Sequence, residues 1–119
     1  MGKRKKTTSP TQRSLAYLRD LGYTCAVVEK FVRFPPPGHR VDLFGFIDLL
    51  ALGPGRTVAA QVTSGSNLSS RVKKIREHEN YPLVRRSGWV IEVHGWRKLK
   101  DGRWYLRILD MESGCERNG

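Results

Sequence analysis

The sequence predicts a single α/β domain in which helices flank a mixed β-sheet, with the element order helix, three strands, helix, two strands. A chain of 119 residues suits one domain with one hydrophobic core. Apolar residues recur at helical spacing in two segments and gather in short runs rich in β-branched and aromatic residues elsewhere. Strands joined by tight turns and one strand–helix–strand crossover together predict both antiparallel and parallel pairing.

The first helix is expected to begin at Thr11, which can cap it, and to end at Gly22. Leucines spaced three apart form its apolar stripe: Leu15, Leu18 and Leu21. Residues 1–10 form a basic arm whose Lys, Arg, Thr, Ser and Pro side chains offer nothing to bury. Residues 23–34 are expected to be extended, and the three prolines that follow end this strand because they lack ladder donors.

The second half begins with a nearly continuous apolar run over residues 44–52, which is typical of a strand buried on both faces. A turn at residues 53–55 joins it to a strand over residues 57–63. A helix is expected over residues 68–78, with the apolar stripe Leu68, Val72 and Ile75. Strands over residues 88–93 and 103–109 complete a domain that spans residues 11–110, and residues 111–119 form a polar tail.

The charge balance points to a polyanionic partner. The chain has 22 Lys and Arg against 11 Asp and Glu, a formal net charge of +11. Nucleic acid is the commonest partner of such a chain, because Lys and Arg displace the counterions of its phosphates. An anionic membrane is the rival, but the Met-Gly start has Lys6 where myristoylation prefers Ser or Thr, and no apolar run approaches the length of a span.

Cysteine usage and the amino terminus indicate the compartment. Cys25 and Cys115 lie far apart without metal-type spacing, so neither a disulfide framework nor a zinc site is implied. No apolar segment follows the basic start as a signal peptide requires. A reducing cytosol, bacterial or of a virus host, is the expected location.

Asp48 is the most informative residue, because a lone carboxylate in an apolar strand is costly to bury unless it is paired or binds a cation. Gln61 and Thr63 share one face of the next strand, since residues two apart point the same way. If Asp48 lies opposite, three oxygen-bearing side chains converge. The alternatives are a core ion pair of Asp48 with Arg40 or Arg56, and ordinary strand polar residues at 61 and 63.

Asp48, the hairpin, Gln61-Val62-Thr63 and the following Ser-Gly-Ser-Asn loop resemble the PD-(D/E)XK nuclease superfamily, in its resolvase-like and VRR-NUC-like branch. The resemblance spans residues 11–93 and implies a restriction-endonuclease-like core. It also implies that Asp48, Gln61 and the carbonyl of Val62 hold Mg²⁺ or Mn²⁺, which take oxygen ligands and assist phosphodiester hydrolysis. Relatives with this fold are often dimers, which leaves a homodimer open.

Three positions depart from the family motif, and one of them is Gln12, which stands where many relatives have a glutamate in the first helix. Gln61 stands where an acid is usual, and Thr63 where a lysine is usual. Asp42 or Glu29 is able to restore a second carboxylate if the fold brings it near. A cation from the second helix is able to replace the lysine, with Lys74, Lys73 and Arg71 as the candidates.

The second helix and the loop before it are the expected nucleic-acid surface, because basic side chains beside one apolar stripe suit phosphate contact. The candidates are Arg40, Ser64, Ser66, Asn67, Arg71, Lys73, Lys74 and Arg76. Two functions therefore stay open. One is a metal-dependent nuclease acting on DNA, such as a junction resolvase, with catalytic Asp48, Gln61, Thr63 and Lys74. The other is a nucleic-acid-binding module that keeps the fold without the chemistry.

Overall fold

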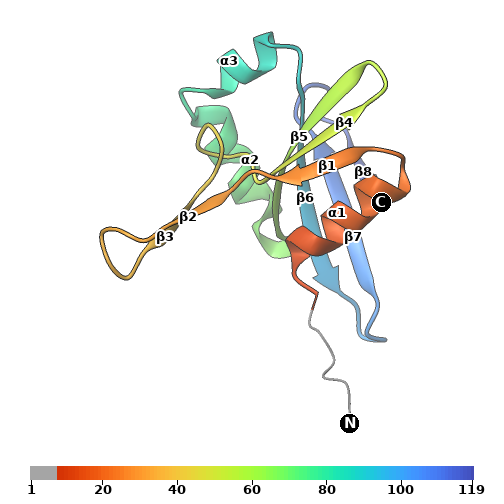
Figure 1. Ribbon diagram of the computed structural model, residues 1–119. Helices are drawn as coiled ribbons and strands as arrows, with labels where there is room; N and C mark the ends of the chain where they lie inside the picture. Colours follow the sequence, from red (N-terminus) through yellow and green to blue (C-terminus); the bar gives the residue numbers. More distant parts are fainter. Residues whose placement is uncertain (1–7) are drawn as a thin grey trace.

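A six-stranded mixed sheet with the strand order β1-β4-β5-β6-β7-β8 forms the centre of the computed structural model, which describes residues 8–119 (Figure 1). Most of the expected basic arm, residues 1–7, lies outside the described residues. Only β5 and β6 pair in parallel, and the other neighbouring strands of this sheet are antiparallel. The α/β class and the mixed sheet are therefore confirmed.

Helix α1 (Pro10–Asp20) covers one face of the sheet. Ser9 rather than Thr11 caps it, since its Oγ accepts a hydrogen bond from the backbone N–H of Gln12 at 3.2 Å. Leu15 and Leu18 are buried against β4 (Leu49–Gly53) and β5 (Arg56–Ser64). Their cluster also contains Leu49, Ala51, Val58 and Ala60.

The extended segment expected over residues 23–34 is two strands that belong to different sheets. Strand β1 (Thr24–Val27) pairs with β4 at the edge of the main sheet. Strand β2 (Lys30–Val32) pairs with β3 (His39–Val41) in a separate two-stranded ribbon. The chain leaves the sheet at Val28, whose N–H donates to the carbonyl of Asp48 at 2.8 Å. Figure 1 shows the ribbon projecting from the body of the protein.

The apolar run over residues 44–52 is also only partly a strand. Residues 44–46 form a turn in which Phe44 has a φ of 55° and Gly45 a φ of 93°. The strand begins at Leu49, so the expected start at residue 44 is wrong. Phe46 and Ile47 are apolar because they pack beneath α2 (Leu68–Glu77), not because they continue the strand.

The crossover between β5 and β6 (Val90–Lys98) contains three short helical segments. A single 3₁₀ turn, η1 (Gly65–Asn67), leads into α2, and α3 (Tyr81–Arg86) follows. The turn packs tightly on β6: a Cβ added at Gly95 would lie 3.2 Å from the Cα of Gly65. A side chain at this contact would push η1 away from the sheet, and the start of α2 with it.

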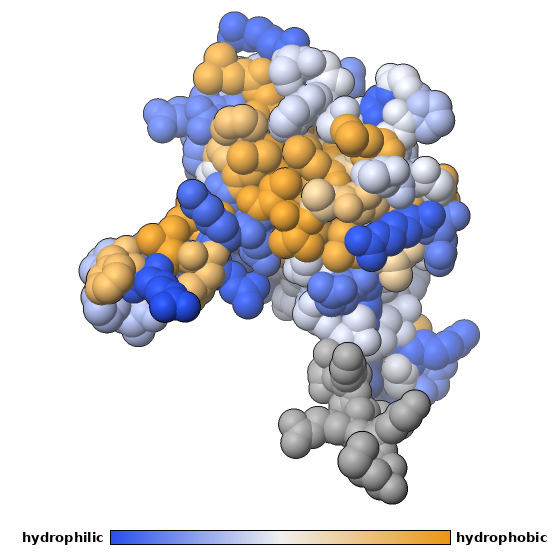
Figure 2. All heavy atoms as spheres, viewed as in Figure 1, coloured by the Kyte–Doolittle hydropathy of each residue, from blue (hydrophilic) through white to orange (hydrophobic). Residues whose placement is uncertain are grey.

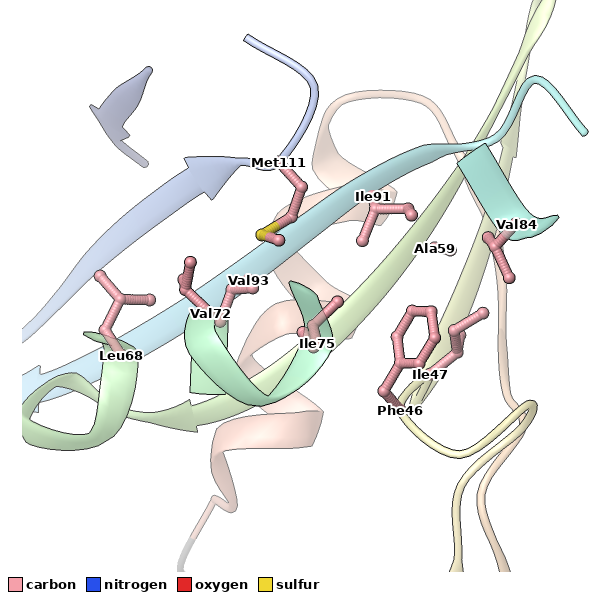
Figure 3. Packing of buried hydrophobic residues seen from close by; sticks show 10 residues of the cluster. All are labelled: Phe46, Ile47, Ala59, Leu68, Val72, Ile75, Val84, Ile91, Val93 and Met111. Carbon is pink, nitrogen blue, oxygen red and sulfur yellow. The ribbon is translucent and has the colours of Figure 1, made fainter. Parts of the chain in front are cut away.

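A second core lies between α2 and the sheet face opposite α1. The stripe of α2 points toward β5 and β6 (Figure 3). The buried residues of this cluster are Phe46, Ile47, Ala59, Leu68, Val72, Ile75, Val84, Ile91, Val93 and Met111. The helix expected over residues 68–78 is thus confirmed to within one residue.

The carboxyl-terminal strands extend the sheet beyond its second parallel strand. Strand β7 (Trp104–Asp110) pairs with β6, and β8 (Glu116–Asn118), within the expected polar tail, pairs with β7. Apolar surface gathers over the region of β1, β4 and β5 (Figure 2), where Val27 and Leu52 are exposed. Within residues 8–119, no helix has the length and apolar character needed to cross a membrane.

The α1 interface gives a stability prediction. Leu18 is 1% exposed and Leu21, just after the same helix, is 57% exposed. Leu18→Ala is expected to lower the free energy of unfolding by about 2–5 kcal/mol, because it leaves a cavity between α1 and the sheet. Leu21→Ala, the matched control, is expected to change it by less than about 1 kcal/mol. Urea denaturation measures both, and equal losses would contradict the packing described.

Candidate metal and nucleic-acid site

Asp48 and Gln61 meet across the β4–β5 pair. Leu49 pairs with Ala60, so the preceding residue, Asp48, faces Gln61 directly. The Nε2 of Gln61 and the backbone N–H of Val62 both donate to Oδ2 of Asp48, each at 2.8 Å. Asp48 is 5% exposed and Gln61 also 5%, so this contact is shielded from water.

Two further carboxylates lie beside Asp48. Glu29, Asp42 and Asp48 each offer one oxygen, and these oxygens all lie within 4.8 Å of one another. Glu29 directly precedes β2 and Asp42 directly follows β3, so both come from the base of the projecting ribbon. We call these three residues the acidic cluster. Asp42 and Glu29 were the two candidates for a second carboxylate, and the fold brings both of them close to Asp48.

The crowding of these acids changes the protonation of Asp48. Burial and a hydrogen bond with Asp42 raise the pKa of Asp48 from its ordinary 3.8 to about 7. The N–H of Val62 and the amide of Gln61 lower it, and the charge of Asp42 raises it further. A bound cation favours the deprotonated form of such a carboxylate, so the donor set fits a hard divalent ion, which prefers oxygen ligands.

A cavity of about 430 Å³ opens between this cluster and α2. We call it the α2 cavity; Asp42, Gln61, Arg71, Lys74 and His78 are among the residues that line it. Arg71, Lys74 and His78 recur at spacings of three and four, so they share one side of α2 and its end. Asp42 and Gln61 therefore line the side of the cavity opposite α2, and Arg71 and Lys74 line the side formed by α2, together with Glu77.

The remaining predicted residues divide between this cavity and the surface around it. Lys73 and Arg76 are exposed on other sides of α2, and Thr63, 7% exposed, lies on β5 two residues beyond Gln61. Within the described part of the chain, the lining of the α2 cavity includes none of these three. Of the two residues named for the cationic position, Lys74 lines the cavity and Thr63 does not.

The loop before α2 is mostly exposed. The hydroxyls of Ser64 and Ser66 lie 3.2 Å apart, and the carbonyl of Asn67 accepts a hydrogen bond from Ser70 at 3.0 Å. Arg40, on the ribbon, pairs with Glu29 at 3.1 Å. Its guanidinium therefore partners the acidic cluster through Glu29, and the salt bridges of residues 8–119 include none between Asp48 and Arg40 or Arg56.

A second buried carboxylate, Glu92, was not singled out from the sequence. His94 connects it to α1: Nε2 lies 3.0 Å from Oε1 of Glu92 and Nδ1 lies 2.9 Å from Oγ of Ser14. Arg117 donates to the other Glu92 oxygen at 2.8 Å, and Trp96 donates to Ser14 at 2.8 Å. Burial raises the pKa of Glu92, but the hydrogen bonds and charges of His94 and Arg117 outweigh it and lower the pKa overall.

The Glu92 network is a structural contact between α1 and the sheet. Ser14 and His94 are 0% exposed, so a substrate does not reach the serine. The sequence signal was available, because Glu92 interrupts an apolar strand in the way that Asp48 does.

Comparison with protein-family models and with curated proteins finds no match to this chain.

The pH dependence of stability tests the environment of Asp48. Its folded pKa, about 7, lies above the ordinary 3.8, so protonation stabilises the folded state and this contribution disappears as pH rises through about 7. Asp48→Asn removes the titration, and its amide keeps an oxygen for Gln61 and Val62. As the pH rises from about 4 to about 8, the free energy of unfolding of the wild type is expected to fall by about 2–4 kcal/mol relative to that of Asp48→Asn.

Urea denaturation with a chelator present measures this difference across the pH range. Asp20→Asn serves as control, because Asp20 is exposed at the end of α1. A difference between Asp48→Asn and wild type that stays constant with pH would contradict the raised pKa of Asp48.

Proposed function

We propose that the protein is a nuclease that hydrolyses phosphodiester bonds of DNA with the help of a divalent metal ion, Mg²⁺ or Mn²⁺. The observation that carries the proposal is the acidic cluster, Glu29, Asp42 and Asp48, next to a cavity whose other wall holds Arg71 and Lys74. Carboxylates suit the metal and the cations suit a phosphate, and a nuclease needs both at one place.

The residues of the site have separate roles in the proposed reaction. Asp48 and Asp42 would hold the ion, and Gln61 with the N–H of Val62 fixes the orientation of the Asp48 carboxylate. Lys74 and Arg71 attract the phosphodiester and stabilise the negative charge that develops at phosphorus. The ion, when bound, activates water and stabilises the attacking and leaving oxygens.

The order of the elements supports a restriction-endonuclease-like core of the PD-(D/E)XK type. A helix comes first, Asp48 directly precedes β4, Gln61 lies on β5, and α2 follows before the parallel strand β6. The departures at residues 61 and 63 have counterparts in space: Asp42 and Glu29 supply carboxylates, and Lys74 supplies a cation. Because these three residues supply the missing carboxylate and the missing cation from other positions, we expect the site to hydrolyse phosphodiester bonds.

A nucleic-acid-binding module without cleavage is the second candidate. It is favoured by Gln61, whose amide donates to Asp48 and adds no negative charge for a metal. The net charge of +11 serves either function equally, because phosphate contacts need no catalysis. Binding that weakens as salt concentration rises is expected of both, so cleavage is the measurement that separates them.

Plasmid nicking tests the nuclease. With Mg²⁺ or Mn²⁺ the wild type is expected to convert supercoiled plasmid to the open circle, and a chelator is expected to stop it. Asp48→Ala is expected to lower the rate by about a hundredfold or more, because the central ligand of the cluster is removed. Asp20→Ala, which removes an exposed acid at the end of α1 that is not part of the acidic cluster, is the matched control and is expected to keep the wild-type rate.

Binding of the same plasmid by wild type and Asp48→Ala, with no metal-dependent cleavage by either, would favour the module and overturn the nuclease. Equal cleavage by the two proteins would show that the activity arises elsewhere or from a contaminant, and would also overturn this assignment of the site.

The paired lysines of α2 test the cationic wall. Lys74 lines the α2 cavity, whereas its neighbour Lys73 is exposed on another side of the helix. Lys74→Ala is expected to lower the cleavage rate at saturating plasmid by about tenfold to a thousandfold, since it removes a group that stabilises developing charge. Lys73→Ala is expected to weaken plasmid binding only. Equal rate losses would contradict the role given to Lys74.

A further inference from the structure

The ribbon formed by β2 and β3 exposes side chains that the proposed cleavage chemistry does not use. Phe31 is 60% exposed and Phe34, near its tip, 74% exposed. Residues 30–41 carry three cationic side chains and no acid: Lys30, Arg33 and Arg40. Figure 2 shows apolar and strongly hydrophilic side chains next to one another on this projecting segment. Exposed aromatic rings among cations are the combination with which proteins bind unpaired nucleotides.

One face of the ribbon leads to the acidic cluster. Phe31 pairs with Arg40 across the two strands, so these side chains share a face. Because side chains alternate along a strand, Glu29 lies on the face of Phe31, and Asp42 on that of Arg40. The salt bridge between Arg40 and Glu29 joins the two halves of this face. Phe31 and Arg40 therefore share the face of the ribbon that leads to Glu29 and Asp42.

The ring of Phe31 has a defined seat. It lies over Gly38, where an added Cβ would come within 2.5 Å of its Cζ. Gly38 also has a φ of 91°, a conformation that favours glycine. The ring therefore packs against the backbone at Gly38, and most of its surface is exposed to solvent. A ring held in this way loses little conformational freedom when a base stacks on it.

We propose that the ribbon binds an unpaired nucleotide, with its base stacked on Phe31 and its phosphate contacting Arg40, whose side chain shares the face of Phe31. The inference rests on the proposed nuclease and names its substrate class: nucleic acid with unpaired nucleotides beside the bond that is cut. Intact duplex does not fit, because stacking neighbours cover both faces of each base. A second copy of this chain fits poorly, since two such ribbons would bring their cations together.

Fluorescence anisotropy in the presence of a chelator tests this without cleavage, using a labelled single strand and the blunt duplex of the same sequence. Phe31→Ala is expected to weaken binding of the single strand about tenfold, as loss of one stacked base does, and of the duplex by less than about twofold. Phe31→Trp is expected to restore binding of the single strand. Leu83→Ala, which truncates an equally exposed residue on α3, is the matched control.

Equal effects of Phe31→Ala on the two probes, or none on either, would overturn the inference, as would wild type that binds neither. A variant that changes oligomeric state in sedimentation without changing affinity for the single strand would assign the ribbon to self-association and overturn it too. Matching urea midpoints for the variants establish that folding is intact. Cleavage is measured in a separate experiment. A protein that does not cleave but loses single-strand binding on Phe31→Ala would contradict the nuclease alone, and a protein that cleaves but shows no effect of Phe31→Ala would contradict the ribbon site alone.

Discussion

The position of Asp48 opposite Gln61 is the constraint on which the rest of the site depends. A slip of one residue between β4 and β5 would turn Asp48 toward α1 and away from the α2 cavity. Two cores prevent this slip, because alternate residues of β5 pack against α1 on one face and α2 on the other. The apolar packing on both sides of the sheet thus determines where a single buried carboxylate points, and the hydrogen bonds from Gln61 and Val62 complete its orientation.

The sequence predicted this pairing because one carboxylate in an apolar run and a polar pair on the next strand are local signals. It also predicted α2, whose apolar stripe matches the helical period. It did not predict the break after Val27 or the turn at Gly45. Apolar content marks burial, and Phe46 and Ile47 are buried under a helix rather than within a strand. The positions of Glu29 and Asp42 depend on these two breaks, so only the fold shows that both reach Asp48.

Asp48 and Glu92 share one sequence signature and have opposite surroundings. Both interrupt apolar segments and both are buried. Glu92 has a histidine and an arginine as partners, and its pKa is lowered. Asp48 has another carboxylate as its neighbour, and its pKa is raised. The identity of the partner, which comes from residues distant in the sequence, separates a carboxylate that stabilises the fold from one that remains available for a ligand.

The acidic cluster lies where the β2–β3 ribbon meets the main sheet. The main sheet carries Asp48, and the base of the ribbon carries Glu29 and Asp42. The ribbon pairs only with itself within the described strands, and the chain meets the sheet again through the bond from Val28 to Asp48. The spacing of the three oxygens therefore depends on how the ribbon is attached to the sheet, and Val28 and Leu43, on either side of the ribbon, pack against the core beneath α2. The same apolar contacts that stabilise the fold therefore also hold two of the three carboxylates next to the third.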